Sequence, residues 1–133
     1  MQSRRSCQIL MAAGSLFAAL AVAAGAFGAH MLKPILDPPM LAVFETAVRY
    51  QMYHALGMIA VGLAGQVLGY PRMAGAGWCL AAGILVFCGS LYGVSLLGIR
   101  WLGAMTPIGG LTFILGWSLF GWSIWREQLS TRA

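Results

Sequence analysis

The stretch Ser6–Leu32, SCQILMAAGSLFAALAVAAGAFGAHML, contains no acidic or basic side chain. It is long enough to cross a bilayer, because a spanning helix needs about 20 mostly apolar residues to cover roughly 30 Å of hydrocarbon. Three later stretches are equally free of Asp, Glu, Lys and Arg, namely Tyr50–Pro71, Met73–Ile99 and Trp101–Trp125. A charge at bilayer depth costs about 2.5–3.5 kcal/mol on insertion scales, so this placement of the charges predicts four transmembrane helices.

The composition of the whole chain agrees with a membrane protein. The 133 residues are 60% hydrophobic and 8% charged, and their mean hydropathy is +0.82. Soluble domains carry about a quarter charged residues, so this chain could not cover itself with polar surface. We predict an all-α fold, an integral membrane bundle of four transmembrane helices in one domain over residues 1–133. The expected spans are at about residues 8–30, 50–70, 73–98 and 107–125.

A short amphipathic helix is expected between the first two spans. Asp37 is placed as an N-cap and Pro38 as a first-turn residue. In the residues that follow, apolar side chains recur at helical spacing, while Glu45 and Arg49 stand four apart in the favourable acid-first order. The pattern predicts an interfacial helix at about residues 38–49 that leads into the second span.

The distribution of basic residues predicts the orientation. An even number of spans puts both termini on one side, and that side carries Arg4, Arg5, Arg72, Arg126 and Arg132, against Lys33, Arg49 and Arg100 on the other. By the positive-inside rule, both termini are cytoplasmic in a multi-pass protein of the inner (plasma) membrane. A cleaved secretory signal is the alternative for the first segment, but the apolar run Ile9–Phe27 exceeds the 7–15 residues typical of a signal core.

Polar residues gather near the outer ends of the predicted spans. Tyr50, Gln51 and His54 are expected on one side of the second span, because residues three and four apart are neighbours on a helix. With this topology, polar groups from all four helices converge on the outer half of the bilayer. The predicted layer consists of His30, Arg49, Tyr50, Gln51, His54, Ser90, Tyr92, Ser95 and Thr106. Such a layer either fixes helix register structurally or binds a ligand.

The residue types in this layer limit the chemistry that it could support. His30 and His54 could ligate haem or a metal ion, but two histidines without a nearby carboxylate or thiolate are a weak signal, so no metal and no cofactor is predicted. Ser95 and His54 could meet as nucleophile and base, but no spacing motif supports catalysis. The absence of charge within the four stretches disfavours a proton-coupled pump. The positive charges are scattered, so lipids rather than nucleic acid are the expected partners.

Several blocks of sequence resemble one family. These blocks are Gly25–His30, Phe44–Leu56, Gly89–Tyr92, Thr106–Gly110 and Gly116-Trp117. In this order they strongly resemble the YgdD-like family of small bacterial membrane proteins, which has small eukaryotic transmembrane relatives, and the resemblance covers about residues 14 to 117. Residues Met31–Met40 depart in length among relatives.

The resemblance implies a four-helix inner-membrane protein with an uncut first helix and carries over no catalytic residue. It marks as family-pattern positions His30, Thr46, Arg49, Tyr50, Gln51, His54, Ser90, Tyr92, Thr106 and Pro107. We therefore expect a non-enzymatic structural or accessory component of the inner membrane, able to pair with a second copy or with a larger membrane complex. The alternative is a carrier of a small solute, an ion or a lipid-like ligand.

Overall fold

The computed structural model describes residues 2–70 and 73–130, and the elements within them are helical. The prediction of an all-α fold is thereby confirmed. In chain order the helices are α1 (Gln2–Phe27), the π-helical η1 (Gly28–Leu32), α2 (Pro38–Val67), α3 (Ala74–Gly83), the π-helical η3 (Ile84–Cys88), α4 (Gly89–Leu97), the 3₁₀-helical η4 (Arg100–Met105) and α5 (Thr106–Ser130).

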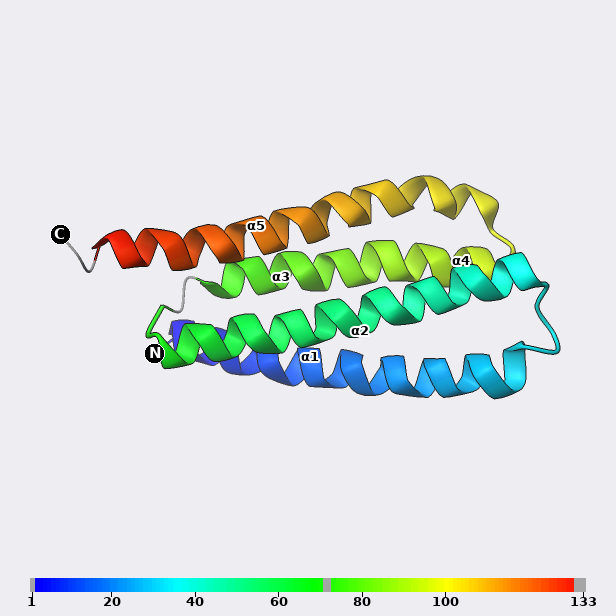
Figure 1. Ribbon diagram of the computed structural model, residues 1–133, viewed down its shortest axis with the longest axis horizontal. Helices are drawn as coiled ribbons and strands as arrows, with labels where there is room; N and C mark the ends of the chain where they lie inside the picture. Colours follow the sequence, from blue (N-terminus) through cyan, green and yellow to red (C-terminus); the bar gives the residue numbers. More distant parts are fainter. Residues whose placement is uncertain (1, 71–72, 131–133) are drawn as a thin grey trace.

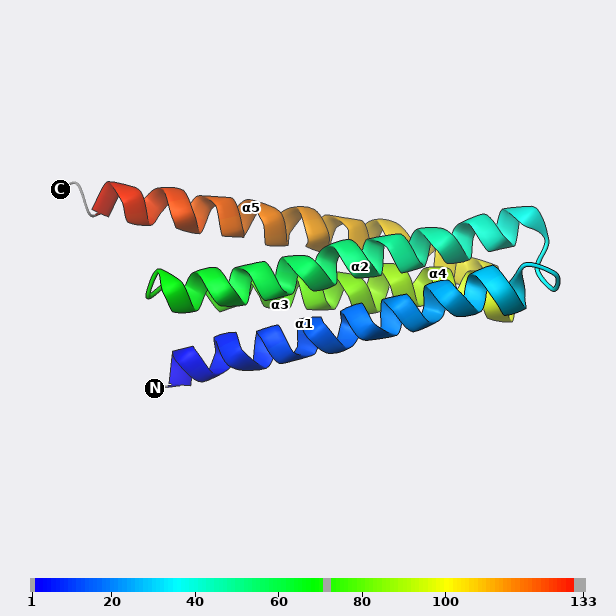
Figure 2. The same ribbon diagram turned by 60° about the horizontal axis from the view of Figure 1, so that its bottom comes forward.

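These helices form four long rods, because η1 continues α1 and η3 joins α3 to α4 without a break. The rods lie side by side, with α1 and α5 on opposite sides of the central pair formed by α2 and the α3–α4 rod (Figures 1 and 2). The start of α1 and the end of α5 lie at the same end of the bundle (Figure 1). Successive rods therefore run in opposite directions.

Among the described residues, three helical segments are long and apolar enough to cross a membrane. They are Arg4–Leu32, Ala74–Leu97 and Arg100–Arg126. The rod α2 is as long as its neighbours but is not one of the three, because polar side chains such as Gln51 and His54 lower the hydropathy of its middle. Length and composition thus support three of the four predicted spans.

Residues 38–49, which the sequence predicts as an interfacial helix leading into the second span, belong to one longer helix. They are the first turns of α2, which runs without interruption from Pro38 to Val67. The predicted N-cap is present, since the Asp37 carboxylate accepts a 2.9 Å hydrogen bond from a backbone N–H of the first turn. No glycine or proline interrupts residues 40–56, and Phe44 is 3% exposed, packed among the rods. The continuous backbone and this buried ring explain why the segment stays in the bundle.

The rods α1 and α2 approach closely at small residues. A Cβ atom added at Gly14 would lie 2.8 Å from the carbonyl oxygen of Ala55, and one added at Gly62 would lie 2.9 Å from that of Cys7. Helices in lipid associate through such close backbone contact, because hydrophobic burial gives them no advantage. Larger apolar side chains fill the space between the four rods, and the largest that are fully buried are Leu10, Met58, Met73, Leu80 and Val61.

Candidate functional site

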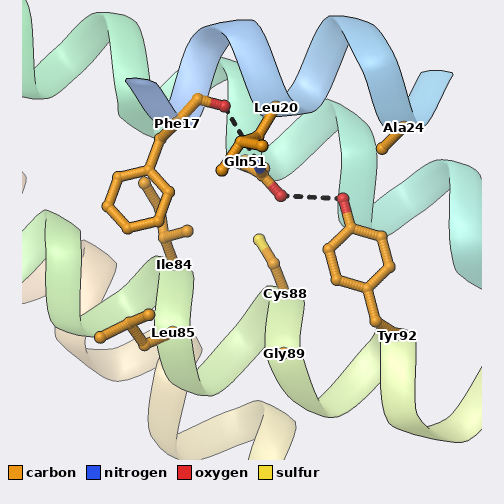
Figure 3. Close-up of a pocket in the computed structure, with 9 residues that line it drawn as sticks. All are labelled: Phe17, Leu20, Ala24, Gln51, Ile84, Leu85, Cys88, Gly89 and Tyr92. Atoms are coloured by element: carbon orange, nitrogen blue, oxygen red, sulfur yellow. Dashed lines mark hydrogen bonds between the residues drawn. The ribbon is translucent and has the colours of Figure 1, made fainter. Parts of the chain in front are cut away.

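Two grooves flank α2 at mid-length of the bundle. The first, here called the Gln51 groove, has a volume of about 350 Å³ and is lined by Phe17, Leu20, Ala24, Gln51, Ile84, Leu85, Cys88, Gly89 and Tyr92 (Figure 3). The second, the His54 groove, has a volume of about 500 Å³ and is lined by Tyr50, His54, Phe87, Gly110, Phe113, Ile114, Trp117 and Ser118. The π-helical η3 contributes residues to both grooves.

The side chain of Gln51 joins three helices. Its Nε2 donates a 2.9 Å hydrogen bond to the carbonyl oxygen of Phe17 in α1, and its Oε1 accepts a 2.8 Å bond from the hydroxyl of Tyr92 in α4 (Figure 3). Gln51 is 6% exposed. Phe17 lies in the middle of the rod formed by α1 and η1, so this network sits at the centre of the bundle rather than in its outer half. The amide is therefore an interhelical tie.

A second polar contact links α4 to α5. The hydroxyls of Ser90 and Thr106 lie 2.9 Å apart, and Ser90 also donates a 2.8 Å bond to the carbonyl oxygen of Phe87. Ser90 is 4% exposed. The hydroxyl of Thr106, at the first residue of α5, thus points across to α4.

His54, three residues after Gln51 in α2, contacts α5 instead of α1 and α4. Its ring is stacked on Phe113 of α5, with centroids 3.4 Å apart and planes 10° from parallel. Its Nδ1 lies 2.6 Å from the carbonyl oxygen of Tyr50, one turn earlier in α2. The ring of Tyr50 in turn stacks on Phe87, with centroids 4.7 Å apart. Stacked rings from α2, η3 and α5 therefore form the walls of the His54 groove.

The remaining predicted residues do not join either set. His30 in η1 and Arg49 in α2 are exposed, and the Arg49 guanidinium donates a 3.3 Å bond to the hydroxyl of Thr46 instead of pairing with Glu45. Arg49 lines a smaller hollow of about 200 Å³ between α1 and α2. Ser95 is buried but donates only to carbonyl oxygens of its own helix, at 2.8 and 3.3 Å. Six of the nine predicted residues therefore form three separate pairs, which are Gln51 with Tyr92, Ser90 with Thr106, and Tyr50 with His54. The side chains of the other three, His30, Arg49 and Ser95, make no hydrogen bond to any side chain of the nine.

The two histidines and the three cysteines do not come together as metal ligands in the described part of the chain. Residues 2–70 and 73–130 contain no group of three or more His, Cys, Asp or Glu side chains that could hold a metal ion. His30 is exposed on η1, whereas His54 packs on α5, on the other side of α2. The three cysteines are free, and the thiol of Cys88 points into the Gln51 groove (Figure 3).

The sequence analysis missed the aromatic residues that build the His54 groove, namely Phe87, Phe113 and Trp117. Aromatic side chains on a membrane helix also face lipid, so their positions alone carry no sign of a groove. Glycines on the neighbouring helices are the signal that could have revealed them. A Cβ atom added at Gly57 would lie 2.9 Å from the Trp117 ring, and one added at Gly83 would overlap the Phe113 ring.

Helices of this length and apolar composition, with large apolar side chains exposed on the surface of the bundle, are typical of a helical membrane protein. The chain belongs to the family described as "Protein of unknown function (DUF423)", which matches residues 24–110. It is 44% identical over 110 residues to a UPF0382 membrane protein of Staphylococcus epidermidis, covering 83% of this chain and 89% of the relative. It is 45% identical over 111 residues to the UPF0382 membrane protein YwdK of Bacillus subtilis, covering 83% and 90%. No solved structure matches the chain.

Proposed function

We propose that the chain crosses the inner membrane four times with both termini in the cytoplasm. The 30 residues of α2 form a rod about 45 Å long, which exceeds the roughly 30 Å of hydrocarbon. Its polar side chains Gln51 and His54 are turned toward other helices instead of lipid, which lowers the cost of placing them in a bilayer. The excess of basic residues on the side of the termini supports the orientation.

Within this topology, the chain serves as a structural or accessory membrane component and carries out no reaction. The observation that carries this proposal is the tie of Gln51 to both Phe17 and Tyr92. An amide whose two ends bond to neighbouring helices fixes the register of those helices. Membrane lipids, a second copy or a larger membrane complex are the partners that such a component would have. The YgdD-like bacterial proteins belong, in this proposal, to the same family.

A matched pair of variants tests the structural role. Tyr92→Phe removes the hydroxyl bonded to Gln51, whereas Ser95→Ala removes a hydroxyl that bonds only within its own helix. Interhelical hydrogen bonds in membrane proteins contribute about 0.6 kcal/mol on average and up to about 1.7. We expect Tyr92→Phe to lower the free energy of unfolding in mild detergent by about that amount, and Ser95→Ala to lower it by less.

The same purified proteins show whether the chain assembles with others. An accessory component should retain stoichiometric partners or a second copy after purification in mild detergent, and Tyr92→Phe should reduce that retention together with stability. If Tyr92→Phe is as stable as the parent chain, the tie is not structural and the proposal is wrong.

The observation that bears on the alternative role as a carrier is the His54 groove, with its volume of about 500 Å³. No observation supports a carrier site built from one combined cluster. Gln51 and Tyr92 line one groove and His54 lines another, while His30 and Arg49 are exposed.

A further inference from the structure

The histidine in the His54 groove presents an unused hydrogen-bond acceptor. A carbonyl oxygen can only accept, so in the 2.6 Å contact with Tyr50 the proton is on Nδ1 of His54. In the neutral imidazole Nε2 then carries a lone pair and no hydrogen. Within residues 2–70 and 73–130, Nε2 makes no hydrogen bond, although His54 is only 6% exposed.

This nitrogen is not fully enclosed by the protein. In the described part of the chain, Nε2 of Gln66 is the side-chain nitrogen or oxygen that is both fully enclosed and without a partner. Nε2 of His54 also lacks a partner and is therefore not enclosed. The His54 ring lines the groove, so a ligand in the groove is within reach of this accessible nitrogen. A ligand that donates a hydrogen bond could satisfy it.

The walls of the groove select a neutral and planar ligand. Apart from the neutral imidazole of His54, no acidic or basic side chain lines the groove, so an ion would lose its hydration without compensation. Tyr50, Phe87 and Phe113 already stack on one another or on His54, and aromatic rings favour such offset or parallel packing. The volume of about 500 Å³ lies within the range of roughly 300–1,000 Å³ that is usual for small-molecule sites.

The groove opens on the outer surface of the bundle, between α2 and α5. Ile114 and Trp117, which line it, are 65% and 43% exposed. In a protein of this family that surface faces lipid, so a ligand enters sideways from the bilayer and its apolar remainder stays among the acyl chains.

We propose that the His54 groove binds the ring of a membrane-dissolved, hydroxylated aromatic molecule of the hydroquinone class, with a ring hydroxyl donating to Nε2 of His54. The site is independent of the Gln51 tie and goes beyond the structural role proposed above. A quinone of the same size has carbonyl oxygens only and cannot donate to this lone pair. The geometry therefore favours the reduced form of such a lipid over the oxidised form.

Three probes test the site on the full chain in detergent under anaerobic conditions. They are an alkyl-hydroquinone, its dimethyl ether and the corresponding alkyl-quinone, with affinity measured by equilibrium dialysis. One net hydrogen bond corresponds to about a threefold to tenfold change in affinity. We expect the parent chain to bind the hydroquinone by that factor more tightly than either other probe. Equal affinity for the three probes, or no binding, overturns the proposal.

Two pairs of variants locate the binding. His54→Phe keeps a ring to stack on Phe113 but removes the acceptor, so the hydroquinone should lose its advantage. His30→Phe changes the other, exposed histidine and should leave that advantage intact. A hydroquinone preference that survives in His54→Phe contradicts the assignment.

The second pair does not depend on the histidine and stays decisive if His54→Phe does not fold. A Cβ atom at Gly110 would meet only the Phe87 ring, at 3.9 Å, so Gly110→Leu is tolerated and its side chain fills the groove. Gly121 on the same helix has nothing within 4 Å, and Gly121→Leu is the matched control outside the groove. We expect Gly110→Leu to lose at least about tenfold in hydroquinone affinity. Unchanged binding by Gly110→Leu rules the groove out.

Discussion

The buried polar side chains in this bundle differ in whether they hydrogen-bond to a neighbouring helix or to their own. Gln51 reaches α1 and α4, Ser90 reaches α5, and Ser95 returns to its own helix. In lipid no water is available to these groups, so a buried polar group without a partner is costly. The hydroxyls and amides that bond across helices are therefore the ones that define which rods are neighbours.

The contact between Ser90 and Thr106 allows a direct measurement of one such bond. We expect Ser90→Ala and Thr106→Val each to destabilise the protein, with a coupling energy of about 0.6 kcal/mol in a double-mutant cycle. The free energy of unfolding in mild detergent is the quantity to measure. Thr112→Val serves as the control, because the Thr112 hydroxyl bonds to the carbonyl oxygen of Gly109 in its own helix. A coupling energy of zero would mean that the two hydroxyls act independently.

The sequence predicts a set of polar residues near the helix contacts but neither which of them are buried nor which of them meet, since His30 and Arg49 are exposed. The spacing of Tyr50, Gln51 and His54 places them on one side of an isolated helix. In the bundle α2 is packed on both sides, so Gln51 turns to α1 and α4 while His54 turns to α5. The partners depend on tertiary contacts that helical periodicity does not contain. The pairing of Gln51 with Tyr92 is thus information from the structure alone.

At the scale of elements, the π-helical η3 contributes side chains to both grooves. Cys88 lines the Gln51 groove and Phe87 lines the His54 groove, and both belong to η3. A π-helical turn shifts the residues after it relative to an α-helix, and such turns occur frequently at functional sites. The sequence ILVFC at residues 84–88 is as apolar as its surroundings, so nothing in its pattern distinguishes it from α-helix. This element could not be predicted.

The close contact between α1 and α2 predicts a strong difference between two glycines. A Cβ atom at Gly62 would lie 2.6 Å from Met11 Cγ and 2.9 Å from the backbone oxygen of Cys7, whereas Gly75 has nothing within 4 Å. Gly62→Val must push the rods apart, and we expect it to lower the free energy of unfolding by about 1–3 kcal/mol. Gly75→Val should change stability by less than about 0.5 kcal/mol. Equal stability of the two variants in a detergent unfolding titration would contradict the close approach.

For the whole molecule, the positions of the charged residues predict the ends of two rods well, because charged residues lie close to the ends of those helices. The predicted spans at 73–98 and 107–125 differ by only a few residues from the rods 74–97 and 106–130. The second span, predicted at 50–70, is in the structure the end of a rod that begins at Pro38. Hydropathy detects only the apolar part of a helix, whereas the Asp37 cap and the packing of Phe44 set where α2 begins.

The number of crossings is decided by α2, and its two ends give the sharpest test. If α2 crosses the membrane, the connection before it and the connection after it lie on opposite sides. Ile35 and Leu68 are 72% and 47% exposed, so cysteines at these positions are accessible to a reagent. In a variant whose native cysteines are replaced, a membrane-impermeant maleimide added to intact cells should label Ile35→Cys and leave Leu68→Cys unlabelled until the membrane is opened.

A C-terminal reporter completes this test, because it counts crossings by parity. Four crossings place the C-terminus on the cytoplasmic side together with the N-terminus, and three crossings place it outside. With the start of α1 and the end of α5 at the same end of the bundle, a reporter fused after Ala133 should be active only in the cytoplasm. If the reporter lies outside, or if Leu68→Cys is labelled from outside together with Ile35→Cys, α2 does not cross and the packed bundle cannot be the arrangement in the membrane.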